Sequence, residues 1–294
     1  MKLLDEFRKT LKDPIVEERL DLLLFRPLAF IVLQLVRRLP VTPNQLSAFS
    51  MLFGIGSGIL FSRGTRDGFL AAGVLYGLTR VIDCSDGMLA RIKNAGTLTG
   101  RIIDGIIDYV NASAVMIGML AGLLKGGFEL PVSPWLLVGP AAFFMILHSI
   151  LIDYFRMEFL CHGLGKSNSP RADFEKFSAE LARLKQQKPR SLDRWIIWVY
   201  LGYLKTQLAR ARTAIPYDRE AYFRANRRLL PAWSLVGSSS YIFVIMVSSI
   251  LGRPEIFFVY ALGFANLCCV VLLIIQMRTN RAVMRAASDP RHGL

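Results

Sequence analysis

The sequence has 294 residues, of which 53% are apolar and 20% are charged, and its mean hydropathy is +0.40. This composition is too apolar for an ordinary soluble domain and excludes a disordered chain. The 36 basic residues outnumber the 22 acidic ones, so the net charge is +14. A basic chain this apolar indicates a membrane protein whose polar surface meets phosphate groups. It argues against a nucleic-acid partner, because nucleic-acid-binding proteins usually carry such charge on a polar chain.

The first predicted element lies in the N-terminal region 1–43. Segment 14–39 has a charged face and an apolar face and contains Pro27. A segment of this kind favours an amphipathic helix lying in the membrane interface over a helix that crosses the bilayer. We therefore expect an interfacial helix before the first membrane span.

Six segments that follow are long enough to cross a membrane, which takes about 20 mostly apolar residues. Four of them contain no Asp, Glu, Lys or Arg: 44–62, 131–152, 229–252 and 256–277. Segments 68–91 and 97–124 reach this length only with charges inside, and such charges usually mark a functional site. The sequence therefore predicts an all-α, polytopic membrane protein with six transmembrane helices.

The basic residues predict the orientation of these helices. If both chain termini lie in the cytoplasm, 31 of the 36 basic residues lie on the cytoplasmic side and only four lie in the outer loops. The positive-inside rule favours this arrangement. We expect three units after the N-terminal region: helices 1–4 at 44–155, a cytoplasmic insert at 156–231, and helices 5–6 with a basic tail at 232–294.

The cytoplasmic insert carries 16 basic and 7 acidic residues. Its segment 171–188 has helical periodicity. Its segment 194–205 is too short to span a bilayer, and its Trp and Tyr residues suit the membrane–water boundary. The basic surface is interpreted as a face for lipid headgroups, with binding of a phosphorylated substrate as the alternative.

The charged residues inside the second and third predicted spans form a pattern. Asp83 and Asp86 share one helical face with Gly87 and Ala90, whereas Gly100, Asp104 and Asp108 recur one turn apart on the next helix. A short loop joins the two helices, so we expect antiparallel neighbours that bring four carboxylates together. Their mutual repulsion would be relieved by Mg²⁺ or Mn²⁺, and four carboxylates can hold two ions.

Metal ions held in this way suit a diphosphate substrate. The small residues Gly87, Ala90 and Gly100 leave a groove for it, and Arg91 offers a forked phosphate donor at the rim. The sequence therefore predicts a metal-bound diphosphate site at the inner membrane boundary.

The order D-x2-D-G-x2-A-R-x8-G-x3-D-x3-D over residues 83–108 resembles the signature of the CDP-alcohol phosphotransferase family and matches each fixed position. The resemblance implies a transferase of phospholipid biosynthesis that moves a phospho-alcohol group from a CDP-linked lipid donor to an alcohol and releases CMP. It also implies a homodimer. In this reading Asp83, Asp86, Asp104 and Asp108 bind metal, and Asp108 is also the general base.

The resemblance further implies that the CDP moiety contacts Asp83 and the small and basic residues of the motif, which are Gly87, Ala90, Arg91 and Gly100. The acceptor is expected to be a small or phosphorylated alcohol, with inositol phosphate or glycerol phosphate favoured by the many inner arginines. Asp153 and Arg156 are candidates for holding it, or else form an ordinary ion pair at the boundary.

Several alternatives stay open. Arg80 either neutralises Asp83 or takes part in the site, His148 is interpreted as a helix-packing residue, and Asn111 either joins helices or lies beside the donor tail. The rival functions are an intramembrane prenyltransferase that uses a magnesium-bound diphosphate, and a cation transporter without catalytic activity. The four cysteines lack metal-binding spacing and are expected to be free thiols.

Overall fold

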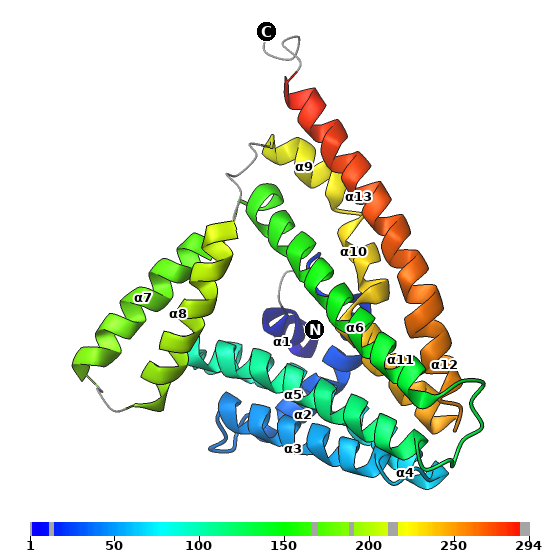
Figure 1. Ribbon diagram of the computed structural model, residues 1–294. Helices are drawn as coiled ribbons and strands as arrows, with labels where there is room; N and C mark the ends of the chain where they lie inside the picture. The colour runs from blue at the N-terminus through cyan, green and yellow to red at the C-terminus, as the bar shows by residue number, and fades with distance from the viewer. Residues whose placement is uncertain (1, 12–14, 166–169, 188–190, 211–216, 289–294) are drawn as a thin grey trace.

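The computed structural model describes residues 2–11, 15–165, 170–187, 191–210 and 217–288, and within these ranges the chain forms helices and no strands. The all-α prediction is confirmed for this part of the chain. The helices, shown in Figure 1, are α1 (Lys2–Thr10), η1 (Asp21–Phe25), α2 (Arg26–Val36), α3 (Pro43–Phe61), α4 (Arg66–Ile92), α5 (Leu98–Leu123), α6 (Pro134–Glu158), η2 (Phe159–Gly163), α7 (Pro170–Gln187), α8 (Leu192–Arg210), α9 (Arg219–Asn226), α10 (Leu230–Trp233), η3 (Ser234–Val236), α11 (Ser238–Ile250), α12 (Glu255–Phe258), η4 (Val259–Phe264) and α13 (Ala265–Ser288).

Five helical stretches in the described residues are long and apolar enough to cross a membrane, which supports a multi-pass membrane protein. They are Pro43–Phe61, Leu98–Leu123, Pro134–Gly163, Leu230–Ile250 and Glu255–Arg285. Each contains or largely overlaps one predicted span. The remaining predicted span, 68–91, lies in the 27-residue helix α4, whose charged residues keep it outside this group. The sixth span therefore stays a prediction.

Helix α4 lies at the centre of one half of the molecule, where it packs against α2, α3 and α11. Helix α3 packs along α4 on one side and along α5 on the other. By contrast, α4 and α5 make few direct backbone contacts with each other. The two acid-bearing helices nevertheless bring carboxylates together, as expected, and α3 packs against both of them.

The remaining spans form the other part of the bundle. Figure 1 shows α6 and α13 as two long helices beside the α3–α5 group. The large buried side chains of this part include Trp233 of α10 and Tyr241 of α11, which belong to the main apolar core. His148 of α6 is buried, and its Nδ1 lies 2.8 Å from the hydroxyl of Tyr241 on α11. The interpretation of His148 as a helix-packing residue is confirmed.

The N-terminal region differs from the single helix expected at 14–39. The backbone at 15–18 is not helical, and the helix then runs through η1 and α2 to Val36. The reason is that Glu17 and Glu18 are buried, where they pair with Arg26 at 3.1 Å and Arg156 at 3.6 Å. The interfacial position of this region remains a prediction.

The structure also refines the insert. The helical stretch of the fourth predicted span continues through η2 to Gly163. Helix α7 confirms the helical periodicity read at 171–188, and α8 contains the short aromatic segment. The two helices pack against each other. The domain boundaries, the orientation and the cytoplasmic location of the insert are not tested by these helices and stay predictions.

Candidate functional site

The candidate site is built from the C-terminal part of α4 and the start of α5. Thr97 ends the short loop before α5, and its Oγ1 accepts a hydrogen bond of 2.9 Å from the backbone N–H of Gly100. This N-cap fixes the first turn of α5. Asp104 and Asp108 follow at intervals of four residues, so the helix stacks them on one face.

Three of the four predicted carboxylates converge. One oxygen each from Asp83, Asp86 and Asp104 can be chosen so that all lie within 4.8 Å of one another. Asp86 is buried, and the other two are partly buried. Asp108 lies outside this group of three and its side chain is exposed, although its charge interacts with those of Asp83 and Asp104. The three close residues offer hard oxygen ligands, which fit a divalent ion such as Mg²⁺ or Mn²⁺.

An arginine lies against this carboxylate group. Arg80 Nη1 donates to Asp83 at 2.8 Å, which confirms that Arg80 neutralises Asp83. The same guanidinium donates two hydrogen bonds to Asp21, of 3.2 and 2.7 Å, and one to the hydroxyl of Ser239. Ser239 in turn donates to Asp21 at 2.7 Å. Arg80 therefore connects the candidate site to the N-terminal region and to α11.

Asp21 carries a negative charge in this setting. Burial raises its pKa, but the charge of Arg80 and the hydrogen bonds from Arg80 and Ser239 together hold the pKa below its ordinary value. Sequence analysis missed Asp21 and Ser239 as partners of the site. Asp21 gave no signal, because it follows the charged residues Glu17, Glu18 and Arg19, and Ser239 gave none either.

Asp86 has its own fixed partner on α3. The hydroxyl of Ser47 donates a hydrogen bond of 2.5 Å to Asp86, and both residues are buried. Helix α3 also approaches Gly100, because a methyl group added there would lie 3.0 Å from the side-chain oxygen of Asn44. Ser47 was likewise missed by sequence analysis, since a serine in an apolar helix gives no functional signal.

The predicted donor contacts lie on the last turns of α4. Arg91 Nε donates to the carbonyl of Thr10 at 2.6 Å, while its Nη2 is buried and has no hydrogen-bond partner among the described residues. A methyl group added at Gly87 would lie 3.7 Å from both Nη atoms of Arg91. Gly87 therefore lies beside the guanidinium, and Ala90 is partly buried on the same turns of the helix.

The predicted acceptor residues form an ion pair, with Arg156 Nη1 3.1 Å from Asp153. Arg156 also lies 3.6 Å from Glu18, which accepts a hydrogen bond from the backbone N–H of Ser239. Arg156 is therefore linked through Glu18 to the same serine that contacts Asp21. Asp153 is largely exposed, with 70% of its side chain accessible.

Asn111 packs between helices, since a methyl group added at Gly54 of α3 would overlap its side chain. This contact shows a role in joining α3 and α5 and leaves the donor-tail alternative open. The four cysteines are free thiols, as expected.

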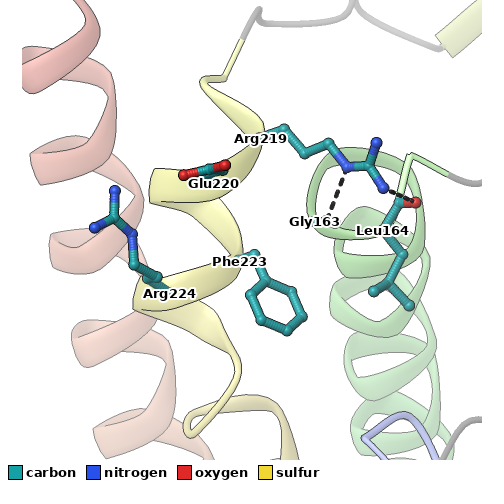
Figure 2. Close-up of a pocket in the computed structure, with 6 residues that line it drawn as sticks. All are labelled: Gly163, Leu164, Arg219, Glu220, Phe223 and Arg224. Atoms are coloured by element: carbon teal, nitrogen blue, oxygen red, sulfur yellow. Dashed lines mark hydrogen bonds between the residues drawn. The ribbon is translucent and has the colours of Figure 1, made fainter.

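A pocket of about 560 Å³ lies elsewhere, between η2 and α9. Figure 2 shows Arg219 reaching across it to the carbonyls of Gly163 and Leu164, with Phe223 and Arg224 on the neighbouring turn. None of the predicted site residues lines this pocket. It is therefore separate from the carboxylate site.

Two curated relatives have similar sequences. One is the bifunctional IPC transferase and DIPP synthase of Thermococcus kodakarensis, 33% identical over 115 residues, which are 39% of this chain and 23% of the relative. The other is the phosphatidylinositol phosphate synthase of Corynebacterium glutamicum, 31% identical over 100 residues, which are 34% of this chain and 44% of the relative. The chain thus matches less than half the length of either relative.

A sequence model of the CDP-alcohol phosphatidyltransferase family matches residues 40–169. This range contains α3, α4, α5 and α6, and with them the four aspartates. The matched range and both relatives therefore agree that residues 40–169 are similar in sequence to the CDP-alcohol phosphatidyltransferase family.

Proposed function

We propose that the protein is a membrane transferase that moves a phospho-alcohol group from a CDP-linked lipid donor to an alcohol and releases CMP. The convergence of Asp83, Asp86 and Asp104 within 4.8 Å supports this function most strongly. Two aspartates of one helix and one of another meet there at the motif that resembles the family signature. The match of the family at residues 40–169 points to the same reaction class.

Asp83, Asp86, Asp104 and Asp108 would hold Mg²⁺ or Mn²⁺, with two ions expected. Such ions, when bound, balance the charge of the donor diphosphate and of the departing CMP. The three carboxylates fit such an ion, because they lie close together and offer hard oxygen ligands. A divalent ion would offset the repulsion among acidic groups this close to one another.

The transfer itself forms a bond between the acceptor oxygen and the β-phosphorus of the donor and breaks the bond from that phosphorus to CMP. Asp108 would accept the proton of the acceptor hydroxyl. Its exposed side chain is accessible to an incoming alcohol, whereas Asp86 is buried and already accepts a hydrogen bond from Ser47. A general base must lie within hydrogen-bond reach of the proton it takes.

The donor would lie along the open side of α4. The free Nη2 of Arg91 offers a hydrogen bond to a phosphate oxygen. Gly87, Ala90 and Gly100 would let the cytidine or the diphosphate come close to the helix backbone. The lipid tail would remain in the bilayer beside α5 while the nucleotide reaches the aqueous boundary.

The acceptor is proposed to be a phosphorylated alcohol, either inositol phosphate or glycerol phosphate. The name of the phosphatidylinositol phosphate synthase relative favours the former. Arg156 is the candidate for holding the acceptor phosphate, with Asp153 next to it. Mass spectrometry of the lipid product formed with each alcohol identifies the acceptor, and a product that appears only with an unphosphorylated alcohol would contradict this part of the proposal.

The decisive test is CMP release by the purified protein with CDP-diacylglycerol, Mg²⁺ and the candidate alcohols. Asp108→Asn should lower the rate by about 100-fold or more, the usual contribution of a general base. Asp67→Asn, at the exposed start of α4, is the matched control and should keep the rate. If no donor yields CMP, the function is wrong; if Asp108→Asn keeps the rate, Asp108 is not the base.

The same assay separates the two rival functions. A prenyltransferase would release diphosphate from a prenyl diphosphate and no CMP, and a transporter would bind cations without releasing either. The residues Gly87, Arg91 and Gly100 beside the acids favour the transferase, because a cation site alone has no need of a phosphate donor or a groove for a nucleotide.

A further inference from the structure

The α7–α8 hairpin has two helices with unlike outer faces. Their shared inner face is apolar and buried: Phe177, Leu181 and Leu184 of α7 pack against Ile197, Leu201 and Leu204 of α8. A helical hairpin in water would turn polar residues outward on both helices. This pattern holds for α7, whose exposed residues include Glu175, Lys176, Arg183 and Lys185.

Helix α8 breaks the pattern. Opposite its buried face it exposes Leu192, Trp195, Trp198 and Val199, at 76%, 66%, 60% and 51% of their surface. The two indole rings lie side by side, with centroids 5.8 Å apart. The charged residues between Leu192 and Val199 are Asp193 and Arg194, and the helical period places both on the sides of the helix, between its exposed and buried faces. A helix that is apolar on both faces needs a second apolar partner.

The depth of the hairpin relative to the membrane follows from its contacts with α5. Ile102, in the second turn of α5, belongs to the same buried cluster as the inner face of α8. Asp173 of α7 lies 3.9 Å from Arg101 in that region. Figure 1 shows the hairpin beside the start of α5. Because α5 is one of the candidate spans, its first turns lie where the membrane meets water, and so does the hairpin packed on them.

Membrane–water boundaries are where exposed tryptophans are enriched, since the indole buries its ring and keeps its N–H hydrated. We propose that α8 lies in the interface of the same bilayer that the spans cross, with Leu192, Trp195, Trp198 and Val199 inserted among the lipids and with α7 facing water. The surface lies outside the carboxylate site, so the proposal stands apart from the proposed transferase activity.

Tryptophan fluorescence tests this surface in the full-length protein reconstituted into vesicles with dibrominated phosphatidylcholine, which quenches indoles within the bilayer. The sequence has four tryptophans, so the signal of Trp195 and Trp198 is the difference between wild type and Trp195→Phe/Trp198→Phe. We expect this difference signal to be quenched strongly by the brominated lipid and weakly by aqueous iodide. Either single Phe variant serves the same comparison if the double variant does not fold.

A tryptophan placed on α7 is the matched control. Lys185→Trp in the double-Phe background should show the reverse, with quenching by iodide and little by brominated lipid. The proposal is overturned if the difference signal responds to iodide and not to the lipid. It is also overturned if that signal is shielded from both quenchers and Trp195→Glu/Trp198→Glu turns a dimer into a monomer, because the face would then bind a second copy of the chain.

Discussion

The surroundings of Asp83 include residues from outside the motif at 83–108. Its closest partner, Arg80, is three residues away on the same helix at 2.8 Å. Arg80 in turn is held by Asp21 from the N-terminal region and Ser239 from α11. The charge of Arg80 is therefore shared between two carboxylates, and Asp83 keeps more of its negative charge for a bound cation than a simple one-to-one pair would allow.

Asp21→Asn tests this positioning role. With Asp21 uncharged, Arg80 pairs with Asp83 alone, so we expect the affinity for Mn²⁺ to fall by about tenfold or more, as is usual when a residue supporting a metal ligand is lost. Calorimetric titration of Mn²⁺ measures the affinity, with Asp67→Asn as the control of equal charge change. A purely structural role would lower the unfolding temperature and leave the Mn²⁺ affinity unchanged, which would contradict the prediction.

Gly87→Ala addresses the donor groove. The added methyl group would contact Arg91 at an ordinary distance of 3.7 Å, so the fold should tolerate it. The space above the guanidinium becomes smaller, and we expect KM for the CDP-linked donor to rise by about tenfold, a common effect of one methyl group in a close-fitting site. Steady-state kinetics give the value, and Gly96→Ala, in open space within the loop, should match wild type. An unchanged KM would place the donor elsewhere.

Among single residues, the sequence predicts those whose spacing indicates a metal site. Four acids at helical intervals in apolar segments point to a metal site by their pattern alone, and three of them do converge. Asp21, Ser47 and Ser239 could not be found in this way, because they come from three other parts of the chain. Only the packing of η1, α3 and α11 around α4 brings them to the aspartates.

At the scale of elements, the close packing of α3 and α5 depends on residues without side chains. A methyl group at Gly118 would overlap the carbonyl oxygen of Gly58, and one at Gly58 would overlap that of Ala114. Small residues allow helix backbones in membranes to approach each other closely. Since α3 also contacts α4, this crossing sets the separation between the two helices that carry the aspartates.

Gly118→Ala should therefore destabilise the protein, by about 1–3 kcal/mol as expected for overpacking. Gly105→Ala is the control on the same helix, since a methyl group there would meet nothing within 4 Å. Thermal unfolding of the detergent-solubilised protein compares the two. Equal midpoints for both variants would show that α3 and α5 move apart freely and that the crossing does not fix the site.

The elements themselves are predicted best where composition is uniform. The runs without charge at 44–62, 131–152, 229–252 and 256–277 each coincide with a helix long enough to span. The N-terminal helix was predicted less well, because the burial of Glu17 and Glu18 in ion pairs depends on distant arginines. The packing of α3 against both α4 and α5 was also beyond the sequence, since a short connecting loop does not show which third helix contacts the two that it joins.

At the scale of the whole molecule, the distribution of basic residues predicts the topology. We expect a cysteine at Arg253, between the last two spans, to react with a membrane-impermeant maleimide added to intact cells. A cysteine at Lys185 on α7 should react only after the membrane is permeabilised. A chain whose four native cysteines are replaced by serine provides the background. The reverse labelling would show that the orientation predicted from the basic residues is inverted.

The hydrogen bond between Arg80 and Ser239 also determines when, during synthesis of the chain, the carboxylate site can be completed. Ser239 lies 159 residues after Arg80 and outside the matched range 40–169. A ribosome that has just released α4 and α5 has produced all four aspartates, but the hydroxyl that contacts both Asp21 and Arg80 is not yet synthesised. The acidic site therefore reaches its final arrangement only after the fifth predicted span has entered the membrane. A chain arrested before that point would contain the whole motif at 83–108 but would lack the Ser239 hydroxyl that holds Asp21 and Arg80.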